Sequence, residues 1–238
     1  MSVMADDSST LPRSLEGAPA LDILRWAASA FPRVTFATGF GAEGCVLIDL
    51  IARHQLPIDL FTLDTGVLFR ETLALWRELE RHYGITIRAV RPVETIDQQA
   101  AHHGAALWSR DPDRCCELRK VAPLRNELSG FDAWITAIRR EQTPERSTAR
   151  VVEHDSKFGL IKINPLATWS YEDVWGHIYL HDVPYNPLHE RGYPSIGCEP
   201  CTSAIVPGES LRAGRWRGAG KRECGLHVPT PVQAKEKS

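Results

Sequence analysis

Four cysteines of this chain lie in two close pairs, and a fifth lies near the C-terminus. Cys115 and Cys116 are adjacent, Cys198 and Cys201 form a CxxC pair, and Cys224 follows in the segment KRECGLH. Four thiolates are the number that holds a four-iron cluster or a structural zinc ion. The fifth cysteine is then free for chemistry, so the count predicts a metal site together with a nucleophile.

The spacing of the two pairs leaves more than one metal chemistry open. Adjacent cysteines are awkward for one zinc ion, which usually takes both sulfurs of a CxxC pair, whereas neighbouring residues can reach different irons of a cluster. Zinc and a redox-active CxxC remain alternatives. Lys120 follows Cys116 by one helical turn and could stand between a cluster and an anionic substrate, or be a solvated helix lysine. Cys45 lies in the apolar run GCVLIDLI and is expected to be a small buried residue.

Basic residues and glycines crowd the segment around the fifth cysteine. The cations that precede Cys224 are Arg212, Arg215, Arg217, Lys221 and Arg222. Positive neighbours lower the pKa of a thiol and favour the reactive thiolate. The glycines at 214, 218, 220 and 225 indicate a flexible segment that can close over a site. The alternative is a basic disordered tail that carries a stray cysteine.

A glycine-rich loop, TGFGAEG at residues 38–44, follows an apolar run at 34–37 that reads as a buried strand. Gly39, Gly41 and Gly44 would let backbone amides approach a phosphate at the start of the next helix. The loop matches neither the Walker A nor the GxGxxG pattern, and an ordinary tight turn is an equal alternative. Asp64-Thr65-Gly66 ends a second predicted strand at 58–63, beside the first loop, although Asp64 could also be a helix cap.

The rest of the chain alternates strand and helix patterns. Further strands are predicted at 85–90, 133–137 and 160–163, and helices at 45–54, at 70–83 with Gly84 as its stop, and after the cap Ser170. This alternation predicts an α/β fold, a mostly parallel twisted sheet flanked by helices, with ligands at the carboxyl ends of the strands. Three arginines follow the fourth strand, and their guanidinium groups suit phosphate and sulfate oxygens, unless the segment is a charged surface loop. They are Arg139, Arg140 and Arg146.

Composition limits the function classes. The chain has 238 residues and a net charge of -2, which gives no electrostatic reason for nucleic-acid or membrane binding. Its N-terminus lacks a signal-peptide pattern, and cysteines in such a chain favour metal or catalytic roles in a reducing cytoplasm. We expect a flexible N-terminal arm at 1–20, one α/β domain at 21–210, and a C-terminal catalytic segment and tail at 211–238, mobile from Val228.

Taken together, these segments resemble the assimilatory adenylylsulfate (APS) reductases of bacteria and plants, in the adenine nucleotide alpha hydrolase-like superfamily. The resemblance runs from about residue 36 to 227 and rests on TGFGAEG, FTLDTGVLFRETL, CCELRKVAPL, AIRREQTPER, YPSIGCEPCT and GRWRGAGKRECGLH. The combination of both cysteine pairs with the ECGLH ending is specific, whereas the glycine-rich loop alone is not. Where the family often has a serine and an acidic or hydroxyl residue, this loop has Thr38 and Gly44.

The resemblance also implies roles for individual residues. A [4Fe-4S] cluster would be held by Cys115, Cys116, Cys198 and Cys201, with Lys120 linking it electrostatically to the substrate. Cys224 would be the nucleophile. The nucleotide would lie across the loop and the LDTG turn, at Thr38, Gly39, Phe40, Gly41, Glu43, Asp64, Thr65 and Gly66. Its phosphate and sulfate oxygens would be held by Arg139, Arg140, Arg212 and Arg215.

The implied reaction is the reduction of adenylylsulfate to sulfite and AMP in sulfate assimilation and cysteine biosynthesis. The Cys224 thiolate would attack the substrate sulfur and form an S-sulfocysteine, from which thioredoxin would release sulfite. Reduction of the 3′-phosphorylated substrate (PAPS) is the nearest alternative. Members that act on PAPS commonly lack both cysteine pairs, and this chain has both, so adenylylsulfate is the favoured substrate. A tRNA-thiolating enzyme would carry an SGGxDS loop, which this sequence lacks. A zinc-stabilised nucleotide-binding module would leave Cys224 unexplained.

Overall fold

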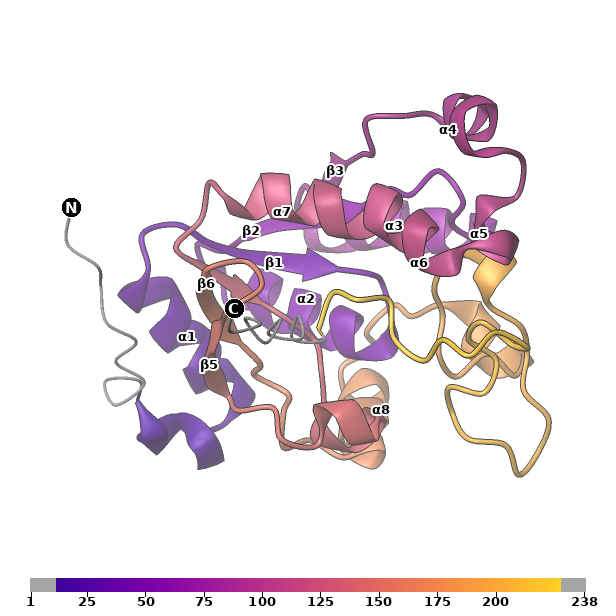
Figure 1. Cartoon of the computed structure of the whole chain (residues 1–238). Helices are drawn as coiled ribbons and strands as arrows, with labels where there is room; N and C mark the ends of the chain where they lie inside the picture. The colour runs from indigo at the N-terminus through magenta and orange to yellow at the C-terminus, as the bar shows by residue number, and fades with distance from the viewer. Residues whose placement is uncertain (1–11, 228–238) are drawn as a thin grey trace, which may run out of the picture.

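The computed structural model describes residues 12–227, and its centre is a six-stranded sheet (Figure 1). The predicted arm up to residue 11 and the tail from Val228 lie outside the described residues. In sheet order the strands are β3 (Arg88–Val90), β2 (Asp59–Leu63), β1 (Val34–Thr38), β4 (Ala133–Ile135), β6 (Leu160–Ile163) and β5 (Val152–Asp155). Neighbouring strands are parallel except for the antiparallel pair of β5 and β6. The predicted mostly parallel sheet is confirmed.

Helices cover both faces of the sheet. The α-helices are α1 (Ala20–Ala30), α2 (Ala42–Arg53), α3 (Arg70–Tyr83), α4 (Ile96–His103), α5 (Leu107–Arg110), α6 (Pro112–Cys116), α7 (Ala122–Leu128) and α8 (Tyr171–Leu180). Figure 1 shows α7 on one side of β1 and the helices α1, α2 and α8 on the other. Two apolar clusters correspond to these faces, one containing Phe36 and Leu47, the other Phe61 and Leu124. No helix among residues 12–227 is long and apolar enough to cross a membrane.

Local chemistry explains where the helices begin and end. Ser170 caps α8 by accepting a hydrogen bond from the Asp173 amide, and the Asp173 carboxylate accepts one in return. Gly84 ends α3 at φ 66°, a left-handed conformation that glycine adopts without strain. One turn of π-helix, η2 (Glu117–Val121), joins α6 to α7 directly after the adjacent cysteines. Such turns recur at functional sites.

Candidate active site

The loop after β1 leads into the N-terminus of α2. Gly41 is the residue before α2, and no side chain caps the helix there. The first amides of a helix lack intrahelical partners and favour an anion, so this end is a potential phosphate site. The Thr38 hydroxyl accepts a hydrogen bond from the Phe40 amide at 3.1 Å. A Cβ at residue 44 would lie 2.9 Å from the same hydroxyl oxygen, which explains Gly44.

Phe40 holds the loop in a strained shape. Its φ is 57°, in the left-handed region that non-glycine residues seldom adopt. Its ring is buried and stacked on Trp76 at 5.7 Å between centroids. This packing fixes the backbone of the glycine-rich loop before α2 begins.

A pocket of about 220 Å³ opens at the carboxyl ends of β1, β2 and β4. Parallel sheets bind ligands at this edge, where strand order reverses around β1. The predicted site residues that line the pocket are Thr38, Gly39, Phe40, Gly41, Thr65, Lys120, Cys198, Arg215 and Cys224. The predicted nucleophile, one predicted metal ligand and two cations therefore share a pocket with the glycine-rich loop.

The CxxC pair packs against the turn that follows β2. The backbones of Cys198 and Leu68 form an isolated antiparallel β-bridge, and the Glu199 amide donates to the carbonyl of Val67 at 2.9 Å. The Thr65 hydroxyl lies 3.3 Å from the Cys198 sulfur. The nucleotide turn predicted from LDTG and the predicted metal site are therefore in direct contact.

The four predicted metal ligands are free thiols brought close together from two parts of the chain. Cys115, Cys116 and Cys198 are buried and Cys201 is partly exposed. Burial raises the pKa of Cys115, Cys116 and Cys201 to about 11, and neighbouring cysteines add to the rise. Within residues 12–227 no group of three or more Cys, His, Asp or Glu side chains is arranged to hold a single metal ion. The metal site itself therefore stays a prediction.

Lys120 is the cation among these thiols. Burial acts to lower its pKa, but electrostatic interaction with the sulfurs of Cys198, Cys224 and Cys116 raises it above the ordinary lysine value. The ammonium is therefore charged and faces both the cysteine set and the pocket. In Cys198 burial acts to raise the pKa, and the attraction of Lys120 with the Thr65 hydrogen bond lowers it below the ordinary thiol value.

A second pocket adjoins the first and contains more of the predicted arginines. It is lined by Gly41, Glu43, Arg139, Arg212 and Arg215, of which Gly41 and Arg215 also line the first pocket. Within the part of the chain that the structure describes, the Nε atoms of Arg212 and Arg215 are buried without a hydrogen-bond partner. Such groups are costly unless a ligand or water satisfies them. Burial lowers the pKa of Arg212 to about 10, which Glu223 partly offsets.

Other predicted substrate residues are already paired. Arg139 donates to Glu43 at 2.9 Å and also contacts Glu141. Arg140 donates to Glu16 at 2.5 Å, and Asp64 accepts from Arg91 at 3.0 Å.

Asp64, Gly66 and Arg140 line neither pocket. Gly66 adopts φ 74° and packs beside Arg119. These three residues therefore lie outside the two pockets, next to residues that line them.

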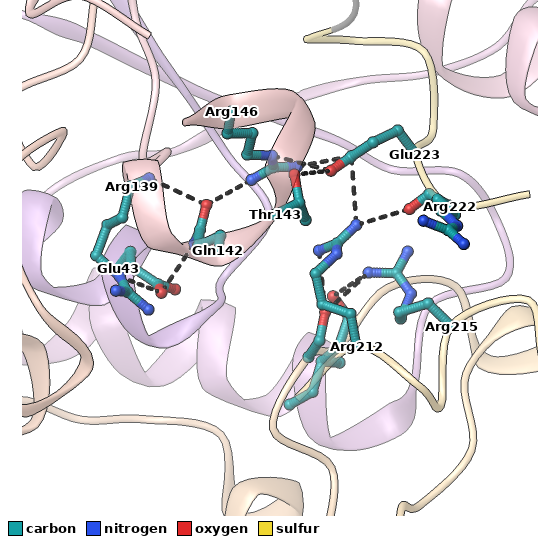
Figure 2. A network of polar contacts seen from close by, with 11 residues as sticks. Glu43, Arg139, Gln142, Thr143, Arg146, Arg212, Arg215, Arg222 and Glu223 are labelled. Atoms are coloured by element: carbon teal, nitrogen blue, oxygen red, sulfur yellow. Dashed lines mark hydrogen bonds and ion pairs between the residues drawn. The ribbon is translucent and has the colours of Figure 1, made fainter. Parts of the chain in front are cut away.

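The segment that carries Cys224 is docked on the sheet edge. Glu223 pairs with Arg146 and Arg212 (Figure 2), Leu226 packs on the apolar cluster of Phe61, and the His227 ring stacks on Trp134 at 5.8 Å. Trp134, Leu226 and His227 also line the first pocket and were not among the predicted site residues. The ECGLH motif contains a signal for the last two, whereas a tryptophan inside a buried strand gives none.

Comparisons with known proteins agree with this arrangement. A family model described as the phosphoadenosine phosphosulfate reductase domain matches residues 33–204. The adenosine 5'-phosphosulfate reductase of Geobacillus thermodenitrificans (strain NG80-2) is 46% identical over 224 residues, 93% of this chain and 95% of that protein. Adenosine 5'-phosphosulfate reductase 1 of Bacillus subtilis (strain 168) is 45% identical over 210 residues, 87% of this chain and 90% of that protein. The crystal structure of a phosphoadenylyl-sulfate (PAPS) reductase from Candida auris in a phosphate complex matches with a TM-score of 0.74 at 32% identity, covering 86% of this chain and 99% of that chain.

Proposed function

The chain belongs to the phosphoadenosine phosphosulfate reductase domain family, and on that premise we propose that it reduces adenylylsulfate to sulfite and AMP. The observation that carries the proposal is the pocket that contains Cys224 together with the glycine-rich loop, Lys120 and Arg215. It combines a nucleophile, an anion-binding helix end and two cations. An anionic sulfonyl donor requires all three.

The substrate is bound by groups that match its charges. Its phosphate lies at the N-terminus of α2, where free backbone amides and the helix dipole favour an anion. Its sulfate oxygens take the guanidinium groups of Arg212 and Arg215, whose buried Nε atoms have no partner within residues 12–227. Arg139 keeps Glu43 in place beside the loop rather than presenting a free charge.

Reduction proceeds through a covalent enzyme intermediate. The Cys224 thiolate attacks the substrate sulfur, an S–S bond forms, and the bond from sulfur to the phosphate oxygen breaks to release AMP. Lys120 and Arg215 offset the repulsion between the thiolate and the sulfate group. One thiol of a reduced dithiol protein of the thioredoxin class then attacks the Cys224 sulfur, which releases sulfite and forms a mixed disulfide with Cys224. The second thiol of that protein attacks the mixed disulfide, which frees the Cys224 thiol and leaves the dithiol protein as a disulfide.

Four thiols at the pocket, of which Cys198 lines it, supply the ligands that a [4Fe-4S] cluster takes, one for each iron. They lie near enough to influence one another electrostatically, with the charged Lys120 beside them, and this donor set supports the cluster. The residues that would hold it are Cys115, Cys116, Cys198 and Cys201. When bound, the cluster supplies a fixed charge that the Lys120 ammonium connects to the substrate. We place the enzyme in a reducing cytoplasm, where these thiols stay unpaired.

PAPS reduction is the second candidate, and relatives named for adenylylsulfate disfavour it. The test supplies purified protein and a reduced thioredoxin with either nucleotide and measures sulfite. We expect sulfite from adenylylsulfate at a kcat/KM at least about tenfold above that for PAPS. Equal or greater turnover of PAPS would reverse the assignment.

A further inference from the structure

Glu223, the residue before Cys224, is the centre of a charged network (Figure 2). Its Oε1 accepts from Arg146 Nε at 3.0 Å and from the Thr143 hydroxyl at 3.3 Å. Its Oε2 accepts from Arg146 Nη2 at 2.7 Å and from Arg212 Nη2 at 3.3 Å. One carboxylate thus receives four hydrogen bonds from three side chains.

The geometry and burial make this a strong contact. Arg146 meets the carboxylate with two nitrogens, the paired arrangement that fixes orientation as well as distance. The side chains of Glu223 and Arg146 are 6% and 10% exposed. Losing one partner of a pair buried to this degree leaves an uncompensated charge, which is strongly unfavourable.

The network joins the C-terminal segment to the body of the protein. Arg146 ends the short helix η4 (Pro144–Arg146), 11 residues after β4 ends at Ile135, and it lines the same pocket as Cys224. Beyond Cys224, Lys157 donates to the Gly225 carbonyl and Leu226 packs into the apolar cluster. Cys224 is therefore held between a charged anchor on one side and a mostly apolar anchor on the other.

We propose that Glu223 is a positioning residue, whose carboxylate holds the Cys224 sulfur at the pocket by pairing with Arg146 and Arg212. The consequence for turnover rests on the proposed function, but the docking itself does not. Without the carboxylate the apolar anchor remains, so the segment stays near the pocket. The Cys224 sulfur, however, is no longer held in one position and becomes more accessible to solvent.

The test measures how fast a neutral alkylating reagent modifies Cys224 in the protein without nucleotide, by peptide mass spectrometry. The rate is measured at increasing pH until it reaches a plateau, where the thiol is fully ionised. The plateau rates of the variants are compared, so a change in the pKa of the thiol does not affect the comparison. We expect Glu223→Gln to raise the plateau rate about tenfold, because the equilibrium between the docked and the undocked segment would shift about tenfold toward the undocked state. Arg146→Gln should do the same, and the double variant should exceed neither, because both remove one contact.

A matched control and a turnover measurement complete the test. Glu209→Gln removes the paired contact of Glu209 with Arg217, which is exposed and not part of this network, and should leave the rate unchanged. Glu223→Asp, which keeps the charge, should restore much of the slow alkylation. In sulfite formation Glu223→Gln should lower kcat about tenfold with little change in the KM for adenylylsulfate.

Alkylation at the wild-type rate in Glu223→Gln, or rates that multiply in the double variant, would overturn the proposal. The proposal would also be overturned if Glu223→Gln lowered thermal stability and the buried Cys45 were alkylated as fast as Cys224. That result would assign Glu223 a purely structural role. Absence of sulfite formation in the wild-type protein would instead reject the proposed function, and the alkylation rates would still decide the docking.

Discussion

The hydroxyl of Thr65 lies 3.3 Å from the sulfur of Cys198. Thr65 follows β2 and Cys198 precedes η6 (Glu199–Cys201), so this contact joins the edge of the sheet to the cysteine set. Both side chains are buried. The end of a strand that faces the pocket is thereby coupled to the predicted cluster.

Thr65→Val should weaken that coupling without changing the shape of the side chain. Loss of the hydrogen bond raises the pKa of Cys198, and we expect the free energy of unfolding to fall by about 1 kcal/mol. Iron should leave the variant roughly tenfold faster under a chelator, because groups that support metal ligands tune affinity by about that much. Thr65→Ser keeps the hydroxyl and is the control. Equal iron loss in all three proteins would refute the coupling.

Lys120→Met tests the cation between the cysteines and the pocket. The ammonium lowers the pKa of Cys116, Cys198 and Cys201, so its removal should raise these pKa values and leave the reacting sulfate with one counter-charge fewer. We expect kcat/KM for adenylylsulfate to fall about 100-fold, in the range for loss of one preorganised electrostatic group. Lys120→Arg retains the charge and should recover part of the activity. Unchanged kinetics in the methionine variant would show that Lys120 is only structural.

Gly197→Ala should displace Arg215. A Cβ at residue 197 would lie 2.2 Å from the Arg215 guanidinium, the flexible end of that side chain, so the arginine rather than the backbone must move. We expect the KM for adenylylsulfate to rise about tenfold, from loss of a charged hydrogen bond, with the denaturation midpoint nearly unchanged. Gly220→Ala meets no atom within 4 Å and serves as the control. A variant with normal KM would place Arg215 outside substrate binding.

His227 predicts how docking of the C-terminal segment depends on pH. Burial lowers its pKa well below the ordinary value, and Arg146 and Lys162 lower it further. Above about pH 6.5 the ring is neutral whether docked or free; below it only the free ring takes up a proton. Docking should therefore weaken as pH falls, by up to about 1.4 kcal/mol per pH unit.

Hydrogen exchange at residues 223–227 measures this effect, once each rate is divided by the intrinsic rate at that pH. At pH values lower than about 6.5, the protection of these amides from exchange should decrease in the wild type. It should stay level in His227→Asn, because asparagine does not titrate. Level protection in both proteins would contradict the assigned role of the histidine ring.

Much of the fold could be predicted because its strands and helix ends have local signals. The apolar run at Leu160–Ile163 and the glycine at 84 match β6 and the end of α3. β5, with the sequence VEHD, was missed because a polar edge strand has no buried run. β3 is shorter than predicted, because the Ile85 and Ile87 amides bond to Glu80 of α3 instead of joining a strand.

The site was less predictable where charges pair across long sequence separations. Arg140 and Arg146 follow the same strand, and the resemblance implies a substrate role for Arg140 and none for Arg146. In the structure Arg140 pairs with Glu16, while Arg146 meets Glu223 at the pocket. Two short 3-10 turns decide which arginine points where. No local pattern encodes a partner more than 70 residues away, whereas the cysteine motifs place a chemically distinctive atom by themselves.

We expect Cys224 to accept the sulfonate group of adenylylsulfate. The most direct measurement mixes purified protein with adenylylsulfate in the absence of any thiol reductant, then maps every cysteine by peptide mass spectrometry and quantifies AMP. We expect one added SO₃ group on Cys224 for each AMP released, and its removal as sulfite when reduced thioredoxin is added. The Cys224→Ser variant should show neither an adduct nor a burst of AMP. AMP release without a Cys224 adduct, or an adduct on another cysteine, would contradict it.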